Sequence, residues 1–351
     1  MNLIAYLTTA AERGASDVFI VAGRPLSVKV NGMLETESQE RLTPADAEEL
    51  VRGIYQLAGN RDMGCFLRTG DDDFSFAIPG VSRFRASVYR QRGSMSAVVR
   101  VITFQIPDPE KLGITPNILS LADYSKGLVL VTGPAGSGKS TTLACIIDRI
   151  NSTKEGHIIT LEDPLEFLHS HKKSIVSQRE ISSDTESYLA ALRAALRQSP
   201  DAILLGEMRD YETIQVAMTA AETGHLILST LHTVGAANTI DRIIDVFPNN
   251  QQHQIAVQLS MVLRAVVSQQ LVPDVEGELI PVFERMTVTP AIRNMIRENK
   301  IHQIDGVVYS SNSEEMVSMD QSLLKLYQAG RIHRDVALQH ASNPEMLSKR
   351  M

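Results

Sequence analysis

The sequence has no tryptophan, only two cysteines, and aromatic residues make up just 5% of its 351 residues. The cysteines, Cys65 and Cys145, lie far apart and belong to no CxxC pair, which excludes a disulfide framework and a zinc ribbon. We expect both thiols to be inert packing residues. No apolar run approaches the roughly 18 residues of a membrane-spanning helix, and residues 1–9 lack the basic start and cleavage site of a signal peptide. We therefore expect a cytoplasmic protein.

An excess of charge of one sign is also missing. The 34 basic and 41 acidic side chains leave a formal net charge of −7, which disfavours generic binding to a polyanion, so we expect no nucleic-acid partner. The hydrophobic share of 43% and the charged share of 21% are ordinary for a globular protein. A chain of this length predicts two or three domains.

The first hundred residues predict a small α/β domain built on antiparallel pairing of neighbouring strands. A short helix ends at Gly14, Asn31-Gly32 is typical of a tight hairpin turn, and Thr43 is placed to cap a second helix. A long hairpin is expected over residues 74–103. We assign residues 1–104 to this domain.

Residues 105–116 contain three prolines and a glycine and show little periodicity, so we predict an interdomain linker there. From residue 117 to 351, short apolar strands alternate with helical stretches, a pattern that predicts crossover connections and a mainly parallel sheet. The region from about 285 to 351 is expected to be mostly helical. The predicted strands are Leu128 to Thr132, Ile158 to Leu161, Ala202 to Leu205 and His225 to Thr230.

A phosphate-binding loop is predicted directly after the first of these strands. Residues 133–140 are Gly-Pro-Ala-Gly-Ser-Gly-Lys-Ser and match GxxxxGK[ST] completely, and a helix-compatible run follows. In this motif backbone N–H groups surround phosphate oxygens, the lysine contacts the β and γ phosphates, and the hydroxyl binds magnesium. We therefore predict a site for a nucleoside triphosphate with Mg²⁺. Its expected contacts are Gly133, Ala135, Gly136, Ser137, Gly138, Lys139, Ser140 and Thr141, with Ser140 on the magnesium.

Two carboxylates follow predicted strands and are candidates for the chemistry of hydrolysis. Glu162 ends the strand that Pro164 stops, and we predict that it is the general base. Glu207 follows the strand that starts at Ala202, although Gly206 stands where many P-loop proteins have an aspartate. We expect Glu207 to organise magnesium, directly or through a water molecule. The alternative for both acids is an ordinary helix cap or surface carboxylate.

Two histidines flank the last predicted strand. His232 follows its end and could contact the γ-phosphate or respond to its loss, whereas His225 precedes its start and would lie far from the phosphate. For both residues, a hydrogen-bonded structural histidine remains the alternative.

Two arginines are expected to face each other in the long hairpin. A turn centred between Arg92 and Gly93 pairs positions whose numbers sum to 185, so Arg85 faces Arg100. Like charges directly across a ladder destabilise it, which suggests an anion between them. An arginine finger supplied by a neighbouring subunit would meet this requirement, and a solvated basic strand face is the alternative.

These motifs together resemble the secretion ATPase superfamily. Residues 159–169, 205–210 and 223–233 are similar to its Asp-box, Walker B and His-box segments, and the phosphate-binding loop is similar to its Walker A segment. Residues 291–298, Ala-Ile-Arg-Asn-Met-Ile-Arg-Glu, are similar to the AIRNLIRE signature of the type IV pilus retraction ATPases, with Met295 in place of leucine. The resemblance covers nearly the whole chain.

The resemblance implies a PAS-like N-terminal domain, a RecA-like P-loop ATPase domain with C-terminal helices, and a ring hexamer with ATP and Mg²⁺ between subunits. It implies catalytic roles for Glu162 and Glu207, contacts in trans from Arg85 and Arg100, and an ATP-driven motor that acts on a platform protein at the inner face of the cytoplasmic membrane. Pilus extension and type II secretion ATPases usually carry a further N-terminal domain and a tetracysteine site, for which this chain has neither the length nor the cysteines. Ala135 replaces a common threonine, and Arg90 has no counterpart from which a role could be transferred.

Three alternatives remain open at this point. One is an accessory retraction ATPase of the PilU type, which works beside a partner motor, although the signature at residues 291–298 disfavours it. Another is a nucleotide-gated regulatory or scaffold ring with little turnover, and the third is a nucleic-acid motor. Within the signature helix, Arg293 and Arg297 lie one turn apart. We expect this pair to meet an acidic contact in the ring or the platform, or otherwise to form a solvated face.

Overall fold

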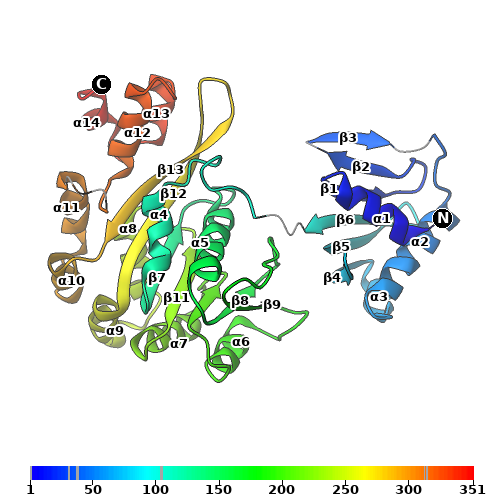
Figure 1. The fold of residues 1–351 in the computed structure, drawn as a ribbon, viewed down its shortest axis with the longest axis horizontal. Helices are drawn as coiled ribbons and strands as arrows, with labels where there is room; N and C mark the ends of the chain where they lie inside the picture. Colours follow the sequence, from blue (N-terminus) through cyan, green and yellow to red (C-terminus); the bar gives the residue numbers. More distant parts are fainter. Residues whose placement is uncertain (1, 31, 37–38, 103–105, 312, 314) are drawn as a thin grey trace. The chain divides into compact units, whose positions relative to one another are not determined.

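The computed structural model describes residues 2–30, 32–36, 39–102, 106–311, 313 and 315–351. These residues form two compact units (Figure 1). Unit 1 contains the described residues up to 102 together with residues 166–168, and unit 2 contains the rest. The mixed α/β class predicted from the sequence is confirmed.

Unit 1 is a six-stranded antiparallel sheet in the order β3-β2-β1-β6-β5-β4. Alternate residues of the strands pack against the helices in one core, in which Ile54, Phe66 and Phe84 are fully buried. The helices therefore cover one face of the sheet, and the intervening residues lie on the other face. The elements are α1 (Leu3–Glu12), β1 (Ala15–Ile20), β2 (Ser27–Val30), β3 (Met33–Thr36), α2 (Pro44–Leu57), α3 (Gly64–Thr69), β4 (Asp71–Ile78), β5 (Ser82–Gln91) and β6 (Ser94–Ile102).

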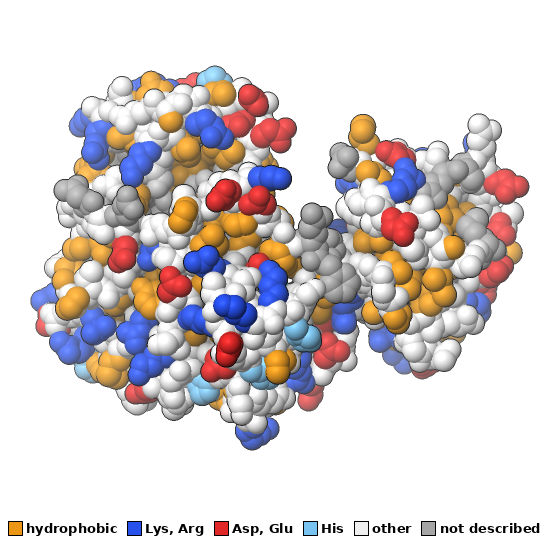
Figure 2. Space-filling model, viewed as in Figure 1, with side chains coloured by type: hydrophobic (Ala, Val, Ile, Leu, Met, Phe, Trp, Pro, Cys, Tyr) orange, Lys and Arg blue, Asp and Glu red, His pale blue; other side chains and the backbone are white. Residues whose placement is uncertain are grey.

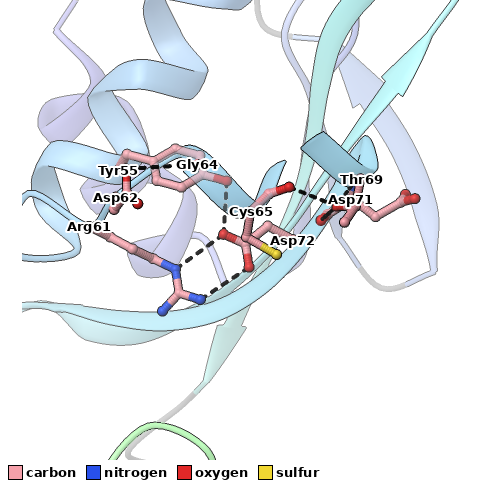
Figure 3. A network of polar contacts seen from close by, with 8 residues as sticks. All are labelled: Tyr55, Arg61, Asp62, Gly64, Cys65, Thr69, Asp71 and Asp72. Atoms are coloured by element: carbon pink, nitrogen blue, oxygen red, sulfur yellow. Dashed lines mark hydrogen bonds and ion pairs between the residues drawn. The ribbon is translucent and has the colours of Figure 1, made fainter. Parts of the chain in front are cut away.

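A buried carboxylate ties α2 and the connection that follows it to the sheet of unit 1 (Figure 3). Asp72 on β4 accepts a hydrogen bond from the Tyr55 hydroxyl at 3.0 Å and two from the Arg61 guanidinium at 3.1 Å each. Tyr55 belongs to α2, and Arg61 lies in the connection to α3. Burial, followed by the interaction with Asp72, raises the pKa of the Tyr55 hydroxyl. This hydroxyl therefore stays protonated and keeps donating to Asp72.

The sequence predicted unit 1 in part. The hairpin turn is confirmed, because Arg92 and Gly93 both have positive φ angles between β5 and β6, and Thr43 caps α2 by accepting a hydrogen bond from the backbone of Asp46. Strand β1 was missed, and β4 joins the predicted hairpin as a third strand. Asn31 of the predicted turn and residues 103–105, where the domain boundary was placed, lie outside the described residues.

Unit 2 contains a seven-stranded sheet in the order β13-β12-β7-β11-β10-β8-β9, parallel except for β13 at one edge. It consists of α4 (Pro116–Leu119), a 3₁₀ turn (Ser120–Asp123), β7 (Gly127–Thr132), α5 (Lys139–Thr153), β8 (His157–Glu162), β9 (Ile175–Glu180), α6 (Tyr188–Ala195), β10 (Ala202–Leu205), α7 (Tyr211–Glu222), β11 (Leu226–Leu231), α8 (Ala236–Asp245), α9 (Asn249–Val262), β12 (Leu263–Pro273), β13 (Leu279–Thr287), α10 (Pro290–Arg297), a 3₁₀ turn (Ile301–Gln303), α11 (Ile304–Ser310), α12 (Met319–Gln328), α13 (Arg334–His340) and α14 (Pro344–Ser348).

The central sheet of unit 2 is buried on both faces. Leu128 and Leu130 of β7 pack with α6 to α10, whereas Val129 and Val131 pack with α4 and α5 on the opposite face. This arrangement explains why the parallel strands are continuous apolar runs rather than alternating ones. Because these strands are parallel, their carboxyl ends lie at the same edge of the sheet.

Two predicted boundaries in unit 2 are corrected. Residues 106–116, expected to be a linker, belong to unit 2, because Ile114 is 3% exposed in its core and Ile106 and Leu112 pack against the same cluster. The helical region predicted from about residue 285 begins at Pro290 instead, since β13 continues to Thr287. Among the described residues, no helix is long and apolar enough to cross a membrane.

Candidate functional site

The predicted phosphate loop connects β7 to α5. Gly136 and Gly138 adopt φ angles of +76° and +85°, which favour glycine. A Cβ atom at Gly133 would lie 2.1 Å from the backbone oxygen of Gln269, so only glycine fits between the loop and β12. The motif glycines are therefore required by the backbone path and by close packing of the loop.

Gln269 on β12 supports this loop and was not found from the sequence. Its side chain is 2% exposed, and its Oε1 accepts a hydrogen bond of 2.8 Å from the Thr142 hydroxyl on α5. A glutamine within the apolar pattern of β12 was the sequence feature that could have indicated this role. Because β12 and β7 are neighbours in the sheet, Gln269 fixes the start of α5 relative to both strands.

Lys139 and Ser137 place a cation and a hydroxyl within the loop. Lys139 is 8% exposed, and its Nζ donates hydrogen bonds of 2.9 Å to the backbone oxygens of Gly133 and Pro134. Ser137 is 2% exposed, and among the described residues its Oγ has no hydrogen-bond partner. A buried donor of this kind is costly unless a ligand accepts its hydrogen bond. The loop therefore fits an incoming phosphate.

The strand ends bring Glu162, Glu207 and His232 to the same edge of the sheet as the loop. Leu205 of β10 pairs with Leu161 of β8, which places Glu162 beside the start of the segment that carries Glu207. Strand β11 lies between β10 and β7, and its last residue, Leu231, pairs with Thr132. His232 therefore leaves the sheet next to the loop strand, as the sequence predicted.

Glu207 and His232 line a cavity of about 450 Å³. The Glu207 carboxylate forms an ion pair with Arg209, in which Oε1 lies 2.6 Å from Nη2. Its other oxygen, Oε2, lies 3.5 Å from His232 Nε2. Its side chain is 15% exposed, whereas those of Arg209 and His232 are 78% and 58% exposed. Arg209 was not among the predicted site residues. The side chains of Arg209 and His232 are exposed, so both can turn away from Glu207 at little cost in free energy.

Tyr188 explains why glycine stands at position 206. A Cβ atom at Gly206 would lie 2.7 Å from the Tyr188 hydroxyl oxygen, so the volume that an aspartate would need is occupied. Burial is the main cause that raises the pKa of Tyr188, and the nearby carboxylates of Asp163, Glu207 and Glu162 raise it further. A neutral tyrosine therefore lies among these acids, and no local sequence pattern predicted it.

Glu162 is half-buried at the end of β8, and its Oε1 accepts a hydrogen bond of 3.4 Å from the Gln178 side chain on β9. This bond is long for a hydrogen bond, and its donor is a neutral amide. The place of Glu162 at the end of β8 is the one expected from the sequence, and its role as the general base stays a prediction.

His225 and the cysteines have structural surroundings. The Nδ1 atom of His225 lies 3.0 Å from the Ala220 backbone oxygen near the end of α7, away from the phosphate loop as expected. Cys145 is buried, and burial raises the pKa of its thiol to about 11. Cys65 is exposed, so the expectation that both thiols are packing residues is wrong for Cys65.

The two hairpin arginines have the predicted register, because Arg85 of β5 pairs with Arg100 of β6. The chain itself supplies part of the expected negative charge. Asp17 of β1 lies opposite Arg100 in the ladder, and its Oδ1 forms an ion pair with Arg100 Nε at 3.1 Å. The sequence analysis missed this because it missed β1. Arg100 is 70% exposed, so the pair is weak and the guanidinium remains accessible.

His169, in the segment after Glu162, gives a prediction about pH. Burial lowers the pKa of His169 to about 4, and its Nδ1 is buried without a hydrogen-bond partner among the described residues. His169 in the unfolded chain binds a proton below about pH 6.5, whereas His169 in the native state does not bind it until the pH approaches 4. The stability of unit 2 should therefore be constant above that value and fall by up to about 3 kcal/mol as the pH decreases toward 4.

Hydrogen exchange of residues 157–180 measures this effect. Between pH 7 and pH 5, after correction for intrinsic rates, exchange should accelerate in the parent protein and far less in His169→Phe, which retains a ring but cannot titrate. His253→Gln, at an exposed histidine, is the control and should behave like the parent. Equal acceleration in His169→Phe would contradict the prediction.

The residues present fit magnesium with a nucleotide. Among the described residues, no three His, Cys, Asp or Glu side chains form a group that could hold a metal ion by themselves. Magnesium in nucleotide sites needs no such group, because phosphate oxygens and water supply most of its ligands. The Ser140 hydroxyl at the start of α5 and the Glu207 carboxylate are oxygen donors of the required type.

The chain is similar to known proteins along nearly its whole length. The family described as Type II/IV secretion system protein matches residues 2–344. The type IV pilus retraction ATPase PilT of Pseudomonas aeruginosa is 43% identical over 345 residues, covering 98% of this chain and 99% of that protein. The type IV pilus ATPase PilU of the same organism is 39% identical over 338 residues, covering 96% of this chain and 88% of that protein.

Among solved structures, a crystal structure of the pilus retraction motor PilT with bound ADP is 45% identical, covers 100% of both chains and has a TM-score of 0.90. The ATPase DotB of Legionella pneumophila is 27% identical, with a TM-score of 0.81, and covers 96% of this chain and 95% of that one. The complete phosphate loop and these chain-long matches show that this chain belongs to the Type II/IV secretion system protein family and is an ATPase.

Proposed function

We propose that this protein is a hexameric ATPase motor that hydrolyses ATP to power the retraction of type IV pili and thereby twitching motility. The observation that carries the proposal is similarity along the whole chain to PilT of Pseudomonas aeruginosa, together with an intact phosphate loop. The motor works in the cytoplasm, at the inner face of the cytoplasmic membrane, where it turns the pilus platform protein. It acts as a homohexamer, and an accessory retraction ATPase is a further partner.

In the proposed reaction, the backbone N–H groups of Gly133 and of residues 135–141, together with the Lys139 ammonium, bind the phosphates of ATP. Ser140 and Glu207 hold Mg²⁺, which supplies charge neutralisation on the phosphate oxygens when it is bound. Glu162 accepts the proton of the attacking water, and its place at the end of β8 puts it at the same edge of the sheet as the loop. His232 responds to the loss of the γ-phosphate through its contact with Glu207.

Arg85 and Arg100 act as fingers on the nucleotide of a neighbouring subunit. Arg85→Ala should lower turnover, by about 10³-fold if it supplies a full arginine finger, without unfolding the monomer. Rings mixed from equal amounts of Arg85→Ala and Lys139→Ala subunits should regain activity, because about a quarter of their interfaces combine an intact loop with an intact finger. The ATPase rate as a function of mixing ratio is the measurement. Arg92→Asn, at the exposed hairpin turn, should keep full activity.

The absence of any recovery in the mixed rings would contradict action in trans. Arg85 is the clearer candidate, since Arg100 is already paired with Asp17. A strong loss for Arg100→Ala and none for Arg85→Ala would reverse this order.

Helix α10 is the proposed contact with the platform protein. Thr289 caps it, and Ile292 and Ile296 are fully buried. The two arginines differ, however. Arg293 donates from Nε to the Ser260 backbone oxygen near the end of α9 at 3.1 Å, so its role is to cap that helix. Arg297 is exposed and remains the residue that can meet an acidic partner.

We expect Arg297→Ala to keep basal ATP hydrolysis and hexamer formation while stopping pilus retraction in cells. Fluorescently labelled pili provide the measurement, with Lys300→Ala on the same surface as the control that should retract normally. Retraction at the normal rate in Arg297→Ala would remove α10 from force transmission. Lost hydrolysis would place Arg297 in the ATPase site instead.

The alternative of an accessory retraction ATPase is favoured by one observation, the 39% identity to PilU. Expression of this chain as the only retraction ATPase in a cell that lacks both motors distinguishes the two roles, since a motor restores retraction alone. A nucleic-acid motor has less support. Basic and acidic side chains are interspersed on the face of unit 2 drawn in Figure 2, which gives no broad positive field there.

A further inference from the structure

A second cavity lies in unit 2 at the edge of the sheet formed by β13. It has a volume of about 480 Å³, which is in the range of small-molecule sites. It is bounded by β13, α12 and the segment that leads into α4. Three strands, β12, β7 and β11, separate β13 from β10. This cavity is therefore distinct from the site that contains Glu162 and Glu207. Nothing in the ATPase reaction uses it.

The lining of this cavity combines an apolar surface with positive charge. Phe283, Ile118 and Leu326 contribute apolar side chains, and Arg285 and Lys325 contribute the charges. Among the described residues that line it, none is an aspartate or glutamate. The cavity therefore favours a ligand that is mostly apolar but carries negative charge.

Arg285 is the deepest charged group in the lining. It is 3% exposed, and its Nη1 donates to the backbone and side-chain oxygens of Asn117 and to the Ser120 hydroxyl. Its Nε is buried and has no hydrogen-bond partner among the described residues. Burial lowers the pKa of Arg285, whereas the interaction with Tyr124 and then the charge of Glu315 oppose this effect. A buried guanidinium whose Nε has no hydrogen-bond partner among the described residues is stabilised when an anion approaches.

We propose that this cavity binds a small amphipathic anion, a molecule with an apolar ring or chain and one acidic group. The apolar body packs against Phe283 and Leu326, and the acidic group lies between Arg285 and Lys325. Lys325 is exposed on α12, so it can move to meet the ligand while Arg285 stays fixed by Asn117.

A matched pair of fluorescent probes tests both parts of the proposal. The first probe, 8-anilinonaphthalene-1-sulfonate, has an apolar ring system with one anionic group. The second, N-phenyl-1-naphthylamine, is the same ring system without the sulfonate. Each is titrated into the full chain with ADP and Mg²⁺ present to occupy the phosphate loop, and the dye is excited directly. We expect the sulfonate probe to bind more tightly than the neutral probe.

Two variants locate the binding. Lys325→Met keeps the length of the side chain without its charge and should raise the Kd of the sulfonate probe at least about fivefold, while changing that of the neutral probe less than about twofold. Thr115→Trp places a bulky ring in the lining and should weaken both probes. Thr115 is exposed and makes no capping hydrogen bond to α4, so this change should leave the fold intact. Lys349→Met, at an exposed lysine, is the charge control.

Basal ATP hydrolysis should be unchanged in all three variants, which shows that each is folded. An equal loss of affinity for both probes in Lys325→Met would overturn the anion site and leave only an apolar pocket. Unchanged binding of both probes in Thr115→Trp would show that the dyes bind elsewhere and would overturn the site altogether.

Discussion

Lys139→Ala should reduce ATP turnover by at least about 10², because it removes the cation that stabilises negative charge developing on the phosphates. The structure adds a second effect. The Lys139 ammonium also ties the loop by donating to the backbone oxygens of Gly133 and Pro134. Alanine loses both roles, so nucleotide affinity should fall together with turnover.

Lys139→Gln separates these roles. Glutamine can still donate to a loop carbonyl but carries no charge, so its turnover should be as low as that of alanine even where nucleotide binding is partly kept. Steady-state ATPase rates and the Kd of a fluorescent ADP analogue, both measured on assembled rings, provide the comparison. Lys111→Ala, at an exposed lysine, is the control. Hydrolysis near the parent rate in either Lys139 variant would disprove the site assignment.

Glu162→Gln should leave ATP binding nearly unchanged and reduce turnover by about 10² to 10⁴, since it removes a general base and preserves the shape of the side chain. Glutamine can keep the contact with the Gln178 amide, because both side chains carry donors and acceptors. The folded structure should therefore be retained. Single-turnover hydrolysis separates the chemical step from product release and is the decisive measurement.

Glu166→Gln is the matched control for Glu162→Gln, since it changes an exposed acid four residues along the same segment. It should hydrolyse ATP at the parent rate. If Glu162→Gln lost binding and turnover equally, Glu162 would be a magnesium ligand or a folding residue. The base would then be sought at Asp163, the exposed acid at the same strand end.

Local sequence signals were sufficient for the phosphate loop and for the hairpin register. The glycines of residues 133–138 specify backbone angles that few other residues adopt, and the Arg92-Gly93 turn fixes every pair of β5 and β6. For the same reason the sequence predicted Thr43 as a helix cap, because a cap depends only on residues within three positions of it.

Features that depend on contacts between distant segments of the chain could not be predicted from local patterns. Strand β1 has a weak alternating pattern, and its identity depends on pairing with β2 and β6. Missing it concealed Asp17, and the charge balance of Arg100 was then incomplete. Residues 106–116 have the composition of a linker, yet Ile114 is buried in unit 2 because the sheet offers it an apolar surface.

The sequence by itself determined the phosphate loop, the two-part α/β organisation and the resemblance to an ATPase superfamily, because each depends on residues close together in the chain. Only the tertiary structure decided which neighbours complete the site. Gln269 reaches the loop from β12, Tyr188 occupies the space above Gly206, and Arg209 pairs with Glu207. The contacts of Gln269 and Tyr188 join segments that are distant in sequence, and all three depend on how strands and connections are placed at one edge of the sheet. No local pattern encodes that placement.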